Sequence, residues 1–130
     1  MAAKRTLSPS NEDYLEKILE LSQSSEAVRS VDIANHLHVS KAGVYKAVGV
    51  LREAGLIAQA HYGQIHLTEQ GRLRAANILQ RHRMLKRFLV EILELDDETA
   101  EQDACRMEHA ISDKTRSRWI EWLHQVLPDP

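Results

Sequence analysis

Apolar residues recur at helical spacing over most of this chain, and one short alternating stretch interrupts them. Leu15, Ile18 and Leu19 form the first apolar stripe, after Ser8, which can cap the start of a helix. The polar, serine-rich stretch 23–26 ends this helix. The pattern therefore predicts an amphipathic first helix.

Two short helices are predicted next, with Ser30 expected to cap the first and Ser40 the second. Val44, Val48 and Leu51 recur at helical spacing and form the inward face of the second helix. Its outward positions are Lys41, Ala42, Tyr45, Lys46 and Arg52, and all of these except Ala42 are polar or basic. A tight turn between two such helices predicts a helix-turn-helix.

Residues 56–60 and 64–67 have strand character, and Ile65 and Leu67 alternate with polar neighbours. Gly63 allows a tight turn between them, together with His61 and Tyr62. We expect a two-stranded hairpin here, the wing of a winged helix-turn-helix.

The rest of the chain is predicted to be helical. Thr68 can cap a long helix that runs to about Leu93, and breaks at 96–98 and 112–113 separate two further helices. The fold class is therefore mainly α, with a winged helix-turn-helix domain at residues 1–72. An α-helical domain follows at residues 73–130, and the boundary lies inside the long helix.

Composition narrows the function classes. The chain has 130 residues, one cysteine and a formal net charge of −2. It has no export signal or membrane-spanning apolar run, so we expect a cytoplasmic protein without a membrane partner. It also lacks a glycine-rich phosphate loop and a convincing nucleophile and base, so we do not expect an enzyme.

The second short helix is a candidate for binding double-stranded DNA. Its exposed N-terminal half is typical of the part that enters the major groove, where side chains read base edges. The predicted DNA-binding residues are Ser40, Lys41, Ala42, Tyr45, Lys46 and Arg52, with Tyr62 at the wing tip. The alternative is a winged helix used for protein contacts, with a solvated basic face.

A candidate metal site begins with Cys105, Glu108 and His109, which would share one face of a helix at i, i+3 and i+4. Thiolate, carboxylate and imidazole together suit a divalent transition metal. Further ligand types stand on two other predicted helices: Asp13, Glu16 and His82. The alternatives are an amphipathic helix with a small buried cysteine, and a redox-sensing thiol at Cys105.

These motifs, in this order, resemble the diphtheria toxin repressor and manganese transport repressor family of metal-activated bacterial transcription factors. The residues that carry the resemblance are Asp13-Tyr14-Leu15-Glu16, Val39-Ser40-Lys41-Ala42-Gly43-Val44, Leu67-Thr68-Glu69-Gln70-Gly71, Arg81-His82-Arg83, Cys105-Arg106-Met107-Glu108-His109 and Ile111-Ser112-Asp113. The resemblance implies a homodimer with an N-terminal DNA-binding part and a C-terminal dimerisation part, in the short form without an SH3-like domain. It also implies that metal binds where the two parts meet.

The resemblance implies a main metal site of Asp13, Cys105, Glu108 and His109. It also implies a second or adjacent position with Glu16 and His82, which can share Glu108. The chain departs from each branch of the family at one position. Iron-type members have methionine at the position of Asp13, and manganese-type members have glutamate at the position of Cys105. The chain therefore combines the ligand sets of the two branches. Lys86 stands where both branches tend to have glutamate, for which Glu101 can partly compensate.

The implied cofactor is Fe(II) or Mn(II), and Zn(II), Co(II) or Ni(II) are expected to bind in vitro. Metal would tie the two parts together and fix the spacing of two recognition helices on a palindromic operator. The alternative function is a winged-helix regulator that senses oxidation of Cys105 or a small organic ligand.

Overall fold

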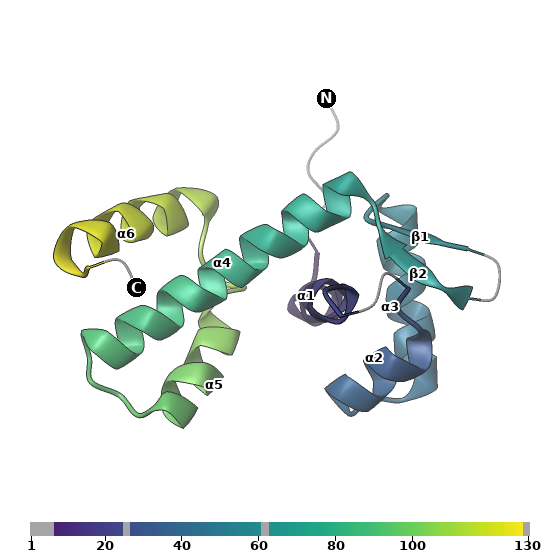
Figure 1. Ribbon diagram of the computed structural model, residues 1–130, viewed down its shortest axis with the longest axis horizontal. Coiled ribbons are helices and arrows are strands. Elements are labelled where there is room, and N and C mark those ends of the chain that lie inside the picture. The colour runs from purple at the N-terminus through teal and green to yellow at the C-terminus, as the bar shows by residue number, and fades with distance from the viewer. Residues whose placement is uncertain (1–6, 25–26, 61–62, 129–130) are drawn as a thin grey trace. The chain divides into compact units, whose positions relative to one another are not determined.

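The computed structural model describes residues 7–24, 27–60 and 63–128, and the chain divides into two compact units between Ala76 and Asn77. The described residues form six helices and a two-stranded sheet, which confirms the predicted mainly α class (Figure 1). The unit boundary lies inside α4 (Glu69–Glu91), the helix in which the predicted domain limit at residue 72 also falls. The functional division into 1–72 and 73–130 stays a prediction.

The N-terminal unit is a winged helix-turn-helix built on one apolar core. Fully buried side chains come from helices, the hairpin and the segment before α2, and include Leu15, Ile18, Ile33, Leu51 and Ile65. The unit's elements, before α4 begins, are α1 (Pro9–Ser22), α2 (Ser30–Leu37), α3 (Lys41–Glu53), β1 (Ile57–Gln59) and β2 (Ile65–Leu67).

Two of the three caps predicted before α4 are confirmed. The Ser8 hydroxyl accepts a hydrogen bond from the backbone N–H of Asn11 at 3.1 Å, and the Ser40 hydroxyl accepts one from Gly43 at 3.0 Å. The prediction that Ser30 caps α2 is wrong, because Ser30 is the first helical residue and Arg29 is the cap. The Asp32 carboxylate accepts from the backbone N–H of Arg29 at 3.3 Å, and this contact takes the place of a serine cap.

The wing is an antiparallel hairpin in which Ile57 pairs with Leu67. Ile65 also pairs with Val28 through two backbone hydrogen bonds of 3.2 and 2.8 Å, so the segment before α2 lies along the outer side of β2. Gly63 has a φ of 75°, a left-handed conformation that glycine adopts without strain. His61 and Tyr62 lie outside the described residues.

The start of α4 is held against the connection between α3 and β1. The Thr68 hydroxyl donates to the Gly55 carbonyl at 2.7 Å and accepts from the Gly71 N–H at 3.0 Å, which confirms the predicted cap. A Cβ atom on Gly71 would lie 1.8 Å from the Leu56 carbonyl oxygen. Glycine is therefore required for this close approach.

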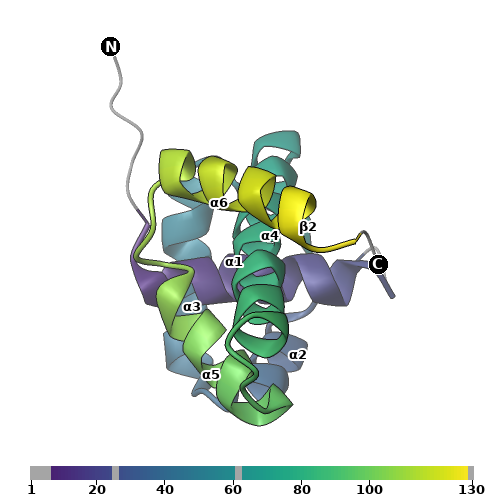
Figure 2. The ribbon, with the colours of Figure 1, turned by 90° about the vertical axis from the view of Figure 1, so that its left-hand side faces the viewer.

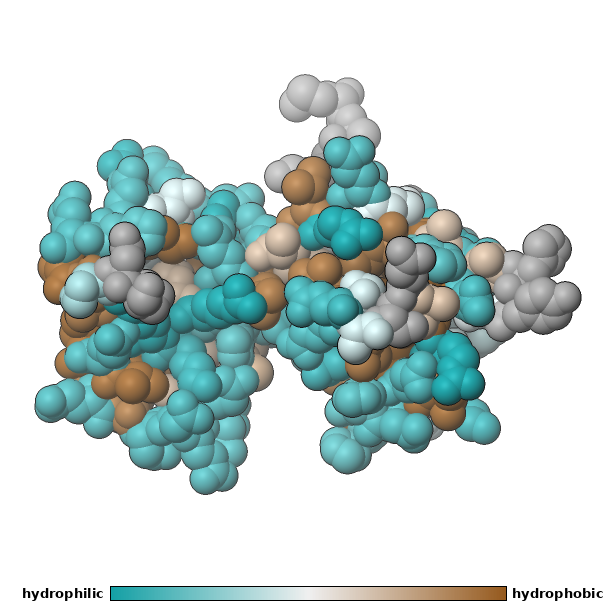
Figure 3. All heavy atoms as spheres, viewed as in Figure 1, coloured by the Kyte–Doolittle hydropathy of each residue, from teal (hydrophilic) through white to brown (hydrophobic). Residues whose placement is uncertain are grey.

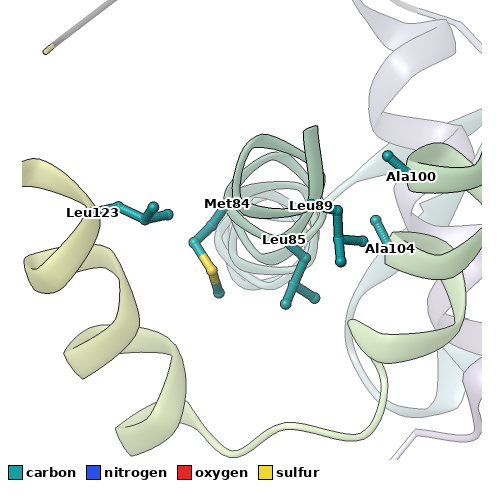
Figure 4. Packing of buried hydrophobic residues seen from close by; sticks show 6 residues of the cluster. All are labelled: Met84, Leu85, Leu89, Ala100, Ala104 and Leu123. Atoms are coloured by element: carbon teal, nitrogen blue, oxygen red, sulfur yellow. The ribbon is translucent and has the colours of Figure 1, made fainter. Parts of the chain in front are cut away.

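The C-terminal unit consists of the second half of α4 with α5 (Asp97–Met107) and α6 (Asp113–Val126). In Figure 2, α5 and α6 flank α4. Met84 points from α4 toward Leu123 of α6, and Leu89 points toward α5 (Figure 4). The two alanines that face α4, Ala100 and Ala104, are fully buried, so their small size allows α5 to approach α4 closely.

The predicted breaks at 96–98 and 112–113 are confirmed as helix starts. The Asp96 carboxylate accepts from the Thr99 N–H at 2.9 Å, which lowers the pKa of Asp96, and the Ser112 hydroxyl accepts from the Thr115 N–H at 3.1 Å. Among residues 7–24, 27–60 and 63–128, no helix combines the length and the apolar character needed to cross a bilayer.

Candidate metal centre and nucleic-acid interface

His82 is the centre of a buried polar cluster in the C-terminal unit. It projects from α4, is only 8% exposed, and lies between two carboxylates. Its Nδ1 atom is 2.8 Å from Glu108 Oε2, and its Nε2 atom is 2.9 Å from Glu101 Oε1. The hydrogen bond with Glu108 is the main reason that the pKa of His82 rises to about 9.

Cys105 completes a set of three potential metal ligands with His82 and Glu108. One ligand atom of each lies within 4.8 Å of the others, and Cys105 Sγ is 3.8 Å from His82 Nδ1. Cys105 is exposed, so the alternative of a small buried core cysteine is wrong. Nitrogen, sulfur and oxygen ligands together fit a divalent transition metal.

The spacing of Cys105, Glu108 and His109 predicted that all three lie on one helix. In the structure the helix ends before the last two of them. Helix α5 ends at Met107, and Glu108 is its C-terminal cap. Glu108 keeps a right-handed helical conformation (φ −60°, ψ −26°), and its N–H donates to the Ala104 carbonyl at 3.0 Å. For this reason Glu108 still faces the same way as Cys105, and it is 1% exposed.

His109 lies in the turn after α5 and belongs to the same cluster. Its Nε2 atom is 3.4 Å from Glu108 Oε1, whereas Glu108 Oε2 faces His82. The Glu108 carboxylate therefore lies between two imidazoles. The structure brings together five predicted ligand residues: His82, Glu101, Cys105, Glu108 and His109.

Arg81 holds the turn that carries Glu108 and His109, a role that the sequence did not reveal. Its guanidinium donates to the carbonyl oxygens of Glu108 at 3.3 Å and Ile111 at 3.2 Å, and it forms an ion pair with Asp113. The only sequence signal was its place beside His82. Nothing in the sequence pattern pairs it with residues about 30 positions later in the chain.

Lys86 and Glu101 extend the cluster toward the start of α5. Lys86 Nζ lies 3.0 Å from Glu101 Oε2 and 3.2 Å from Asp97 Oδ1, and the contact with Glu101 is the main cause of a raised Lys86 pKa. Burial acts to raise the pKa of Glu101, but hydrogen bonds with Lys86 and His82 outweigh it and lower that pKa. Glu101 is thus held as a carboxylate between two cationic partners.

The two remaining predicted ligands, Asp13 and Glu16, lie on α1 in the N-terminal unit. Asp13 is exposed and Glu16 is half-buried, and they are one helical turn apart. Their participation in a metal site stays a prediction.

The predicted DNA-binding face of α3 is exposed as expected. Lys41, Ala42, Tyr45 and Lys46 are all exposed, and Tyr45 is 82% accessible to solvent. Ser40 is exposed too, although its hydroxyl is engaged in capping α3. The Arg52 side chain donates to Gln59 Oε1 on β1 at 2.8 Å, so Arg52 also braces the wing against α3. Tyr62 lies outside the described residues.

Two domain models of one protein family together match almost the whole of this chain. Residues 6–65 match "Iron dependent repressor, N-terminal DNA binding domain", and residues 68–130 match "Iron dependent repressor, metal binding and dimerisation domain". The chain belongs to the iron-dependent repressor family. This confirms the resemblance to the diphtheria toxin repressor and manganese transport repressor proteins.

Several known proteins are similar in sequence to this chain. An uncharacterised HTH-type transcriptional regulator of Methanocaldococcus jannaschii is 37% identical over 113 residues, which cover 86% of this chain and 90% of that protein. The diphtheria toxin repressor of Corynebacterium diphtheriae is 30% identical over 97% of this chain. The match spans only 56% of the diphtheria toxin repressor.

Among solved structures, the manganese regulator SloR is similar, with a TM-score of 0.80 and 29% identity. The match covers 91% of this chain and 55% of SloR. In this chain, residues 68–130, which match the metal-binding and dimerisation domain, contain the whole His82 cluster. Residues 6–65, which match the DNA-binding domain, contain α3.

Proposed function

We propose that this protein is a transcriptional repressor that binds DNA when a divalent metal is bound. The observation that carries the proposal is the grouping of His82, Cys105 and Glu108 ligand atoms within 4.8 Å, inside the segment that matches a metal-binding domain. Because the family consists of repressors, we also propose that the protein is a regulator rather than an enzyme and that it acts in the cytoplasm.

The proposed ligands from the C-terminal unit are His82, Cys105, Glu108 and His109, and Asp13 and Glu16 of α1 are proposed to add carboxylate oxygens. The carboxylates favour Mn(II), and the Cys105 thiolate shifts the preference toward Fe(II), with Zn(II), Co(II) and Ni(II) as competitors in vitro. When bound, the metal would supply positive charge and cross-links between side chains. It would have no chemical reaction to perform.

Metal would act by connecting the unit that reads DNA to the unit that dimerises. With Asp13 and Glu16 on one side and the His82 cluster on the other, the bound ion would restrict the movement of the two units. In a symmetric dimer this would hold two α3 helices about 34 Å apart, or a multiple of it, to match successive major grooves of a palindromic operator. Because binding free energies are reciprocal, DNA would strengthen metal binding by the same factor.

DNA contact is proposed for the N-terminal half of α3. The exposed residues Tyr45, Ala42 and Ser40 are proposed to meet base edges, and Lys41 and Lys46 to meet phosphates. Arg52 and Tyr62 are proposed to contact the sugar-phosphate backbone of the DNA beside the wing. Long basic side chains can reach phosphates over several ångströms, so the bracing contact of Arg52 does not exclude this role.

Dimerisation is proposed to occur through an aromatic groove on the C-terminal unit. Phe88 and Trp119 contact each other edge to face with ring centroids 4.9 Å apart, and Trp122 is 5.9 Å from Phe88. They line an open groove of about 680 Å³, and hydrophobic side chains reach the surface of this unit (Figure 3). A second copy is the proposed occupant, because this segment matches a dimerisation domain.

A DNA-binding titration tests the proposed function. A duplex enriched from a random library in the presence of Mn(II) would be labelled, and its anisotropy measured with Mn(II), Fe(II), Zn(II) or EDTA. We expect tight binding with metal and a loss of at least about a hundredfold in EDTA, equivalent to about 2.7 kcal/mol of coupling.

The variant Cys105→Ala should require a higher metal concentration, whereas Gln102→Ala, at an exposed position of α5, should behave as wild type. Equal affinity in Mn(II) and EDTA would contradict the proposal. A response to peroxide without any metal requirement would instead support an oxidation-sensing regulator.

A further inference from the structure

Lys86 is placed to influence the metal cluster without being able to bind metal itself. It lies one helical turn after His82 on α4, and its ammonium contacts Glu101 Oε2 at 3.0 Å and Asp97 Oδ1 at 3.2 Å. An ammonium has three donors and no acceptor, so in its charged form it has no lone pair for a metal. Its position makes it a fixed cation beside two carboxylates.

Glu101 connects this cation to His82. One carboxylate oxygen, Oε2, faces Lys86, and the other, Oε1, lies 2.9 Å from His82 Nε2. Both oxygens of Glu101 are thus engaged. A carboxylate that holds one ring nitrogen of a histidine fixes the ring, and the other nitrogen becomes the one that faces a metal.

The second ring nitrogen, His82 Nδ1, faces the other potential ligands. It is 2.8 Å from Glu108 Oε2 and 3.8 Å from Cys105 Sγ. The two sides of the ring therefore differ: the Nδ1 side offers a carboxylate and a thiol, and the Nε2 side offers a carboxylate that already has a cation. A divalent ion on the Nε2 side would have to displace the Lys86 ammonium or be repelled by it.

We propose that the Lys86 ammonium holds Glu101 in place and that Glu101 in turn orients the His82 ring. As a result the chain binds one divalent metal, on the Nδ1 side of His82, rather than two. The inference rests on the proposed metal-binding function. Lys86 and Glu101 are positioning residues, and His82, Cys105 and Glu108 are the ligands they serve. Asp97 gives the Lys86 ammonium a second anionic contact, which also helps to hold it in position.

The number of metals bound per subunit tests this inference directly. Full-length metal-free protein would be titrated with Co(II), and the bound ions counted by native mass spectrometry and by the absorption bands of the Co(II) ion. We expect one Co(II) per subunit in wild type. In Lys86→Glu a carboxylate replaces the cation beside Glu101 and His82 Nε2, and we expect two.

The variant Lys86→Met removes the cation without adding a ligand, and we expect about tenfold weaker Co(II) binding with an altered Co(II) spectrum, because Glu101 no longer fixes the ring. The matched control is Arg87→Met, which removes a neighbouring α4 cation whose ion pair is with Glu91 at 2.7 Å. It should bind Co(II) as wild type does.

Two Co(II) ions in wild type, one in Lys86→Glu, or a Lys86→Met titration identical to that of Arg87→Met would each overturn the inference. If the proposed metal-binding function is wrong, the result is different, because the wild-type protein would then bind no Co(II) at micromolar concentrations.

Discussion

His82 is the residue on which the electrostatics of the cluster depend. In the metal-free protein its ring lies between the carboxylates of Glu101 and Glu108, which favour the protonated, charged form. The proton and a divalent ion would therefore compete for the same position between His82 and Glu108.

The metal-free protein is predicted to lose stability as pH rises from about 6.5 to about 9. The pKa of His82 is raised in the folded state to about 9 from an ordinary 6.5, so its contribution is complete below pH 6.5 and is lost as pH rises through 9. The full shift corresponds to at most about 3 kcal/mol. Thermal unfolding in EDTA across pH 6 to 9.5 would measure this loss.

The matched variants for that measurement are His82→Gln, which should show a flatter pH profile, and His124→Gln, at an exposed position of α6, which should keep the wild-type profile. A wild-type profile without any decline over this pH range would contradict the prediction.

At the residue scale, sequence spacing predicted the candidate ligands but not the residues that hold them in place. Cys105 and Glu108 keep helical spacing, so periodicity was enough to place them on one face, whereas His109 joins them from the turn that follows α5. Arg81 contacts the carbonyl oxygens of Glu108 and Ile111, and backbone acceptors are the same for every residue type. No pattern of side chains can therefore point to such a contact.

At the element scale, α3 presents the basic and polar side chains of Lys41, Tyr45 and Lys46 to solvent. Lys46→Ala is predicted to weaken DNA binding by about tenfold or less and to lower the slope of log affinity against log salt by about one, because one phosphate contact is lost. The loss should be similar for specific and random DNA, since phosphate contacts carry no sequence information.

Anisotropy titrations at several salt concentrations, with saturating metal, would measure both effects. The control is Lys17→Ala, a lysine of α1 that pairs with Glu20 at 2.7 Å. An unchanged salt slope in Lys46→Ala would contradict the proposed phosphate contact, and so would an equal change in Lys17→Ala.

Most helix starts in this chain could be predicted from the residue that caps them, whereas the end of α5 could not. Ser8, Ser40, Thr68, Asp96 and Ser112 all cap as their chemistry suggests, because a short polar side chain satisfies N–H groups only two or three residues away. The end of α5 at Met107 has no glycine or asparagine signal. A distant side chain, Arg81, binds the carbonyl oxygens that follow the helix, so tertiary contacts stabilise that end.

At the scale of the whole molecule, the aromatic groove is the feature that predicts assembly. Trp122 is 42% exposed in a single chain, although it lies beside Phe88 and Trp119. Trp122→Glu is predicted to raise the dissociation constant of the dimer at least about thirtyfold, because truncating a buried interface tryptophan costs about 2 kcal/mol or more. Light scattering over a concentration series would measure the change.

The control for that prediction is Ser117→Glu, which adds the same charge at another exposed position of α6. It should leave the assembly unchanged. A wild-type protein that is monomeric throughout the concentration series would contradict a dimer, whereas a Trp122→Glu protein that dimerises normally would exclude only the groove as its interface.

The position of Glu108 at the C-terminal end of α5 has a consequence for metal selectivity. The aligned peptide dipoles of a helix place about half a negative elementary charge at its C-terminus, which adds to the charge of Glu108. This dipole field attracts every divalent cation alike, so it raises affinity without distinguishing iron from manganese or zinc. The discrimination between metals is therefore left to the donor atoms themselves, and Cys105 is the one soft donor among them.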